Sequence, residues 1–165
     1  MCEYTNGKPL EKTYLEVVFL GRKNFKLIED FNYQFKQDLA IERELIVNGI
    51  AKEYDNRYTK TYYITIPKGF NTDFGSIPQL FQSLVSPIGS PTKAYVLHDY
   101  LLSLYLQGKI TKRKVCDKTF RTALKNEGVG MVRRSFMYLC VRAYSTYKDF
   151  VKKIKDKFKK DKDEA

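Results

Sequence analysis

The ten residues Gly69-Phe70-Asn71-Thr72-Asp73-Phe74-Gly75-Ser76-Ile77-Pro78 separate two halves of the chain that have different hydrophobic patterns. Before this stretch, β-branched and aromatic segments alternate with polar residues, and we expect strands at 14–20, 31–35 and 62–66. After Pro78, apolar residues recur every three or four positions, which is the spacing of amphipathic helices. The sequence therefore predicts an α+β fold, with N-terminal antiparallel strands followed by a C-terminal bundle of about four helices.

The helical half divides at its Gly and Pro residues. We expect a short helix at 80–85, a second from about Thr92 to Gly108, a third that Thr111 caps and Gly128 ends, and a fourth from about Met131. In the first half, 39–50 fits either a strand or a short helix, and its Asn48-Gly49 pair is a turn signal typical of hairpins.

Length and composition favour one domain. A chain of 165 residues can bury one core, and we expect a single α+β domain at 1–147 and a Lys-rich amphipathic helical tail at 148–165 that frays at its end. Three cysteines, an odd count without ligand-like spacing, argue against a disulfide framework or a zinc site of cysteines. Because no apolar run approaches the roughly 20 residues that span a bilayer, the sequence predicts no transmembrane segment and a cytoplasm-like compartment.

Positive charge is concentrated in the middle of the helical half. The formal net charge is +11, and nine Lys or Arg lie between Lys109 and Arg134, against only Asp117 and Glu127. Such a basic face favours phosphate backbones, anionic lipid or an acidic protein. Two interpretations stay open: a contact with nucleic acid, or a solvated helix face.

The polar turn and the only histidine are the first candidates for a site. Asp73 and Ser76 lie in the strand-to-helix connection, where either could cap the helix that begins at Pro78. The segment Leu97-His98-Asp99-Tyr100 lies on the second expected helix, with His98 and Asp99 about 100° apart around its axis. We expect the turn and this helix to meet, and Asp73 across from His98 would form a carboxylate–imidazole pair.

The third and fourth helices supply further candidates. Asp117 precedes Arg121 by four residues, the spacing of an ion pair on one helix. Arg134, Tyr138 and Arg142 follow on the fourth helix, and an arginine so near core positions should pair with Asp99 or Asp117. In one interpretation, a buried polar network joins the helices to the turn through Asp73, His98, Asp99, Asp117 and Arg142.

In the other interpretation, the same residues form a site. The catalytic candidates are His98, Asp73, Asp99 and Ser76, and the binding candidates are Asp117, Arg121, Arg134, Tyr138 and Arg142. One His and up to three Asp could hold a divalent metal with open water positions, which would suit a hydrolase. Ser76 as a nucleophile with His98 as its base is a weaker hypothesis, because the chain has no Gly-x-Ser-x-Gly elbow.

Four blocks of sequence carry a family resemblance: Gly69 to Pro78, Ala94 to Leu102, Cys116 to Phe120 with Ala123-Leu124 and Gly128-Val129, and Met137-Tyr138 with Val141-Arg142. In this order they resemble the phage and prophage family catalogued as domain of unknown function thirteen fifty-three. The resemblance covers about 60–145, with Gly75 where the family usually has Ala. It implies a phage or prophage origin and assigns no catalytic residues.

Two functions from different classes follow. The first is a noncatalytic virion, assembly or host-interaction component, whose partner is a phage structural protein or a host factor and whose Lys109–Arg134 face could contact nucleic acid. The alternative is a small hydrolase of a phosphoester or cell-wall bond that uses His98 with Asp73, Asp99 and Asp117. A single histidine leaves few ways to build an active site, which favours the first. The expected location is the host cytoplasm during infection, or the virion.

Overall fold

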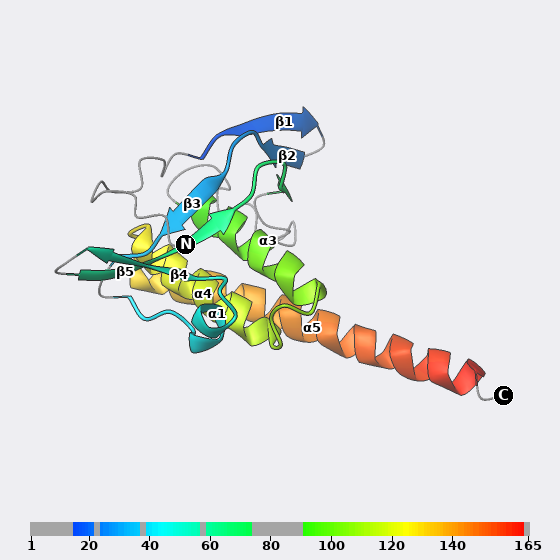
Figure 1. Ribbon diagram of the computed structural model, residues 1–165. Helices are drawn as coiled ribbons and strands as arrows, with labels where there is room; N and C mark the ends of the chain where they lie inside the picture. Colours follow the sequence, from blue (N-terminus) through cyan, green and yellow to red (C-terminus); the bar gives the residue numbers. More distant parts are fainter. Residues whose placement is uncertain (1–14, 22–23, 37–38, 57–58, 74–90, 164–165) are drawn as a thin grey trace.

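Strands occupy the first half of the chain and helices the second, as Figure 1 shows, so the expected α+β architecture is confirmed. The structure is a computed structural model that describes residues 15–21, 24–36, 39–56, 59–73 and 91–163. The helix expected at 80–85 lies outside these residues.

The strands form two small antiparallel sheets. In the first sheet the order is β1 (Val17–Gly21), β2 (Asn24–Leu27) and β6 (Asn71–Thr72). In the second sheet the order is β3 (Phe31–Gln34), β5 (Thr59–Ile66) and β4 (Lys52–Asn56). The three strands expected from the sequence are therefore present, with bounds that differ by a few residues.

The alternation of β3 decides which face of the second sheet is buried. Phe31 and Tyr33 are buried and lie opposite Ile66 and Ile64 of β5, whereas the intervening polar residues of β3 are half-buried. Successive side chains of a strand point to opposite faces, so the aromatic and isoleucine side chains share the inner face. This face is part of the hydrophobic core that the helices complete.

The stretch that fits either a strand or a helix contains a short helix, α1 (Arg43–Val47). Asn48-Gly49 ends this helix instead of forming a hairpin turn. Gly49 adopts a φ of +67°, and the N–H groups of Ile50 and Ala51 both donate to the carbonyl of Leu45, at 2.9 and 2.8 Å. A glycine in the left-handed conformation can end a helix as well as form a hairpin turn. Here the segment is helical, and its Leu45 side chain is fully buried.

Three helices follow at the expected places: α3 (Thr92–Leu106), α4 (Arg113–Asn126) and α5 (Met131–Asp163). One detail is wrong: Thr111 does not cap α4. The N-cap residue is Lys112, which makes no side-chain cap bond, and the N–H of Thr111 instead donates to the carboxylate of Glu44. The connection before α4 is thus held by α1, a contact that local capping rules do not consider.

Helix α4 packs against both α3 and α5, so it is the central helix of the bundle. Figure 1 shows that the C-terminal part of α5 extends well beyond the other elements. The division of the chain at 147/148 stays a prediction, since α5 continues through it without interruption. Among the described residues, no helix is long and apolar enough to cross a membrane.

Candidate functional site

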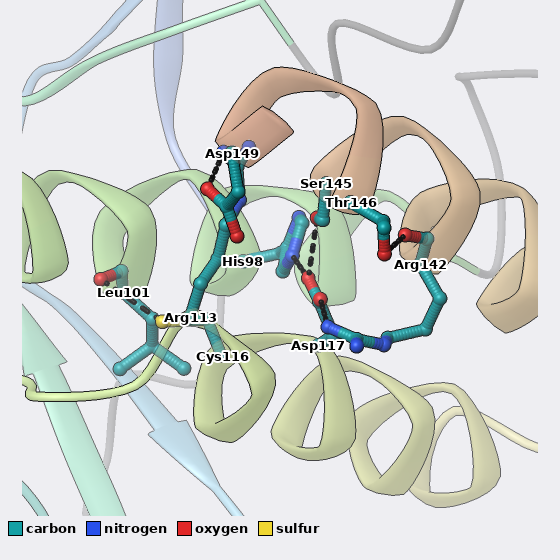
Figure 2. A network of polar contacts seen from close by, with 9 residues as sticks. All are labelled: His98, Leu101, Arg113, Cys116, Asp117, Arg142, Ser145, Thr146 and Asp149. Carbon is teal, nitrogen blue, oxygen red and sulfur yellow. Dashed lines mark hydrogen bonds and ion pairs between the residues drawn. The ribbon is translucent and has the colours of Figure 1, made fainter. Parts of the chain in front are cut away.

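The only histidine is paired with a buried carboxylate where α3 crosses α4. His98 of α3 is 6% exposed, and its Nε2 lies 3.0 Å from Oδ1 of Asp117, which is fully buried on α4 (Figure 2). The two residues are 19 positions apart in the sequence. This pair brings together two of the predicted site residues.

Helix α5 completes the arrangement from a third side. Arg142 donates from a guanidinium nitrogen to Oδ2 of Asp117 at 2.8 Å, and the hydroxyl of Ser145 lies 3.3 Å from Oδ1 (Figure 2). Asp117 is thus bonded to groups from both neighbouring helices. We call His98, Asp117, Arg142 and Ser145 the carboxylate network.

The network keeps Asp117 ionised. Burial alone would raise the pKa of this carboxyl, but the hydrogen bonds from His98 and Arg142 outweigh burial, so the pKa is lowered below its usual value. At neutral pH the carboxylate therefore accepts hydrogen bonds and does not exchange a proton. Breaking up such a buried set would leave an uncompensated charge.

The imidazole of His98 is buried and packs against an aromatic side chain. Its ring lies 4.8 Å from the ring of Phe120, which in turn lies 5.5 Å from that of Tyr95. Leu97 and Leu101, on the same helix, are fully buried. The ring is packed as a core side chain, which is the environment expected of a structural histidine.

Asp99 takes part in a separate contact. Its Oδ2 accepts a hydrogen bond of 2.6 Å from the hydroxyl of Thr72, which is buried on β6. This bond joins the Thr-Asp-Phe turn to the His-Asp helix, so the expected meeting of the two motifs is confirmed. The two neighbours on α3 therefore serve different contacts, as the 100° angle between them requires.

The structure does not pair Asp73, a candidate from the turn, with His98. Asp73 is half-buried next to Thr72, and the carboxylate bonded to Nε2 of His98 belongs to Asp117 rather than to Asp73. Ser76 lies outside the described residues. Their catalytic or binding roles stay predictions.

The remaining arginine and tyrosine candidates are engaged near the surface. Arg121 does not form the expected ion pair with Asp117, because Asp117 points inward and is bonded to Arg142. The guanidinium of Arg121 instead lies 5.3 Å from the centre of the Tyr138 ring. Arg134 donates to the carbonyl of Val129 at 3.2 Å.

Sequence reasoning missed Ser145 and Thr72. Ser145 follows Arg142 by three residues, which places both on one side of α5, and this spacing could have suggested a shared partner. Thr72 carried no such signal, because its bond to Asp99 depends on how β6 meets α3. The partner of the Thr72 hydroxyl is therefore determined by the folded structure and not by the local sequence.

The arrangement differs from the usual sites of hydrolases. Among residues 15–21, 24–36, 39–56, 59–73 and 91–163, no group of three or more His, Cys, Asp or Glu side chains gathers as a metal site would require. The hydroxyl of Ser145 bonds the carboxylate and not the imidazole, so the order of a Ser-His-Asp triad is absent from the carboxylate network.

Comparison with known families adds one finding. The family described as "Protein of unknown function (DUF1353)" matches residues 49–141, more than half of the chain. The chain belongs to this family. The matched DUF1353 region contains both the Thr72–Asp99 and the His98–Asp117 contacts, whereas Arg142 is the first residue after it and Ser145 lies three residues further on. No curated protein and no solved structure was found to match the chain.

This DUF1353 chain has an open groove away from the carboxylate network. It encloses about 680 Å³ beside β3, the start of α3 and the end of α4. The Tyr33 hydroxyl fixes one wall: it is 3.1 Å from the carbonyl of Ala123 and 3.0 Å from Oε1 of Glu127, and burial raises its pKa. The groove is lined by Phe31, Asn32, Tyr33, Gln34, Phe35, Lys36, Thr61, Lys93, Asn126 and Glu127.

A row of cations lies on the outer face of α4. Lys114, Lys118, Arg121 and Lys125 are all exposed, and their spacing of four, three and four residues places them in one line along the helix. We call this row the basic ridge. Lys118 pairs with the residue just before α1, since its Nζ lies 3.3 Å from a carboxylate oxygen of Glu42. The ridge is the part of the Lys109–Arg134 face that α4 presents to solvent.

Proposed function

We propose that this chain is a noncatalytic component of a phage or prophage that acts in assembly or in contact with a host factor. The observation that supports the noncatalytic role is the carboxylate network: the candidate base His98 is buried, and its partner Asp117 is held by two further donors. The resemblance of the four motif blocks to a phage and prophage family supports the origin.

A binding role would use the open groove. Among the described residues, its lining offers amides, a threonine, two lysines and a glutamate beside three almost fully buried aromatic rings, and it includes no His, Cys or Ser. A concave surface that combines apolar parts with a few fixed polar groups is typical of recognition sites. We therefore place the contact with a partner protein at this groove.

The experiment compares two replacements of His98. We expect His98→Ala to lower the free energy of unfolding by about 1–3 kcal/mol, because the substitution leaves Asp117 without one buried donor. We expect His98→Gln to recover a large part of this loss, since an amide nitrogen can donate to Asp117 where Nε2 did. Urea unfolding followed by circular dichroism measures both.

The same pair of variants separates the proposed role from hydrolysis. Glutamine can donate a hydrogen bond but cannot exchange a proton near neutral pH, so a His98→Gln protein would be folded and inactive if His98 were a catalytic base. If hydrolysis of a phosphodiester or cell-wall substrate by the wild type disappears in a stable His98→Gln variant, the noncatalytic proposal is wrong.

The basic ridge supports a second candidate function, contact with a nucleic-acid backbone. Residues 114 to 125 span about 16 Å along α4, a length over which four cations can meet successive phosphates. Duplex DNA is the probe. If all four side chains contact phosphates, we expect the logarithm of the affinity to fall with the logarithm of salt concentration at a slope of about −3 to −4.

Removing two ridge cations tests this candidate. For Lys114→Gln combined with Lys125→Gln, we expect the slope to become less negative by about 2, because two counterions fewer are released. Lys36→Gln combined with Lys68→Gln removes the same charge from exposed positions outside the ridge and should leave the slope nearly unchanged. Equal effects of the two double variants would show that net charge, and not the ridge, controls binding.

A further inference from the structure

Strand β3 is at an edge of its sheet, and one side of its backbone is open. Among the described residues, β3 has a strand neighbour only in β5. The N–H of Phe35 donates to the carbonyl of Tyr62 on this side, at 2.9 Å. Because residues that bond across an antiparallel ladder alternate with residues that do not, the backbone N–H and C=O groups of Asn32 and Gln34 point away from β5.

A side-chain amide already bonds this edge as a peptide group would. Asn126 is the last residue of α4, and its Nδ2 donates to the carbonyl of Gln34 at 2.9 Å. Its Oδ1 accepts a hydrogen bond of 2.9 Å from the N–H of Lys36. The amide groups of a neighbouring strand offer the same donor and the same acceptor. The edge of β3 is therefore accessible to amide partners on the side of α4.

Three backbone groups of the edge remain open. They are the N–H and C=O of Asn32 and the N–H of Gln34, which bond no other group in the part of the chain that the structure describes. The side chain of Asn32 is already engaged, since its Oδ1 accepts a hydrogen bond of 2.7 Å from the Thr65 hydroxyl. Unpaired backbone groups on an edge strand are a template for pairing with another chain, so the backbone itself is the binding feature here.

The open groove follows this edge. Six consecutive residues of its lining, 31–36, belong to β3 and the two positions after it. The rings of Phe31, Tyr33 and Phe35 are at most 2% exposed, so they contribute little to the surface of the groove. An occupant therefore binds chiefly through backbone hydrogen bonds and charge, as a peptide does when it adds a strand to a sheet.

The charges of the groove favour an acidic occupant. Lys36 is exposed and Lys93 is half-buried, and neither forms an ion pair with the residues that the structure describes. Glu127 also lines the groove, but it accepts a hydrogen bond of 3.0 Å from the Tyr33 hydroxyl. Two such lysines, on a chain with a formal net charge of +11, attract a segment that carries carboxylates.

We propose that the edge of β3 binds an extended acidic segment of a partner protein, which adds to the sheet beside β3 as a further strand. This inference rests on the proposed function, because it specifies how the partner occupies the groove. Backbone bonds to Asn32 and Gln34 hold the segment in place, and Lys36 and Lys93 pair with its carboxylates. At about 3.3 Å per residue, a segment of about five residues is long enough to pass β3.

Two capped octapeptides serve as probes, one of alternating Thr and Glu and one of alternating Thr and Lys. Thr favours an extended backbone in both, so the two probes differ in charge. We expect the Glu peptide to bind at least about 10-fold more tightly than the Lys peptide and to shift the backbone amide signals of Asn32 and Gln34 in a nitrogen–proton correlation spectrum. A Glu peptide that does not bind at about 1 mM, or that leaves both signals unchanged, would overturn the proposal.

Replacing Asn32 tests the backbone bonds. Asn32→Pro removes the outward N–H, which the ladder with β5 does not use, and edge strands tolerate proline at such positions. We expect this variant to bind the Glu peptide at least about 10-fold more weakly than the wild type. Asn32→Thr is the matched control, because it loses the same side-chain amide but keeps the N–H, and it should bind as the wild type does. Equal affinities of the two variants, with both folded by circular dichroism, would count against strand addition.

A change in the peptide gives the same information without altering the protein. The Glu peptide with an N-methyl group on every residue keeps its charge but has no backbone N–H to donate. We expect it to bind the wild type at least about 10-fold more weakly than the unmethylated peptide. Undiminished binding of the methylated peptide would exclude strand addition, even if Asn32→Pro does not fold.

The two lysines separate this inference from the proposed contact at the groove. We expect Lys36→Gln combined with Lys93→Gln to weaken binding of the Glu peptide at least about 10-fold. Lys52→Gln combined with Lys68→Gln removes the same charge from exposed positions outside the groove and should weaken it less than about 3-fold. If the groove lysines matter but the two Asn32 variants bind equally, the groove contact stands and strand addition is wrong. If neither matters, the partner does not bind at this groove.

The measurement also distinguishes the partner from a second copy of this chain. We expect the wild type to sediment as a monomer over a concentration range of about two decades. A wild-type dimer that Asn32→Pro dissociates and Asn32→Thr retains would assign the edge of β3 to a second copy and would overturn the proposal.

Discussion

Replacing Asp117 with Ala is expected to lower the free energy of unfolding by about 3–5 kcal/mol. The carboxylate is fully buried and is bonded to His98, Arg142 and Ser145, so its removal leaves the guanidinium of Arg142 and the imidazole of His98 without their partner. Because Asp117 of α4 is bonded to His98 of α3 and to Arg142 of α5, its loss also loosens the packing of α3 and α5 on α4. Urea unfolding followed by circular dichroism measures the change.

Asp149 provides the matched control. This carboxylate pairs with Arg113 at 3.5 Å but is 40% exposed, so Asp149→Ala should cost only about 0–1 kcal/mol. Replacing Asp117 and Arg142 together by Leu and Met should cost less than Asp117→Ala alone, since no unpaired cation then remains. If Asp117→Ala costs no more than Asp149→Ala, the carboxylate network does not hold the helices together.

Acid should reveal the same group. The pKa of Asp117 is lowered in the folded chain, so the stability it contributes is fully present above the unfolded value of about 3.9 and is lost as the pH falls through the folded pKa. The wild type should therefore lose more stability below about pH 4 than the Asp117→Leu, Arg142→Met double variant does. Parallel pH profiles for the two proteins would contradict this assignment.

Phe120→Ala is expected to have an effect of similar size, about 3–5 kcal/mol. The ring is fully buried and lies against both His98 and Tyr95, so its removal opens a cavity beside the carboxylate network. Thermal and urea unfolding measure the loss. Phe120→Leu retains most of the volume and should cost less than about 1.5 kcal/mol.

Phe19 supplies the comparison for Phe120. It is also a phenylalanine in contact with one other ring, Phe25 at 5.2 Å, but it is 61% exposed on β1. Phe19→Ala should therefore change the free energy of unfolding by less than about 1 kcal/mol. Similar losses for Phe19→Ala and Phe120→Ala would mean that the ring of Phe120 is not closely packed.

The helical half of the fold was predictable because its signals are local. Apolar spacing predicted the helices that the structure shows as α3, α4 and α5. Tertiary contacts decided the rest. Leu45 is buried within a short helix, so Asn48-Gly49 ends that helix instead of forming a hairpin turn. Thr111 was expected to cap the third helix, but its N–H donates to the carboxylate of Glu44.

The sequence predicted which residues form the candidate site better than it predicted which of them bond to one another. The sequence predicted His98, Asp117 and Arg142 as parts of one network, and the structure confirms that these three are in contact. The sequence could not show that Asp99 would accept a hydrogen bond from Thr72. Neighbouring residues on a helix face different elements, and only the complete fold determines which strand Asp99 meets. The partner of a side chain across 20 or more residues depends on how whole elements dock.

The hydroxyl of Tyr33 that fixes the wall of the groove also has a consequence for how the chain folds. It meets the carbonyl of Ala123 across 90 residues, whereas α3 and α4 are joined by a short connection. Closing a long loop costs more chain entropy than closing a short one, and contacts of high sequence separation form slowly. We therefore expect the helical half to assemble first and the strands to close over it late, with Tyr33 among the last side chains to reach its native partners.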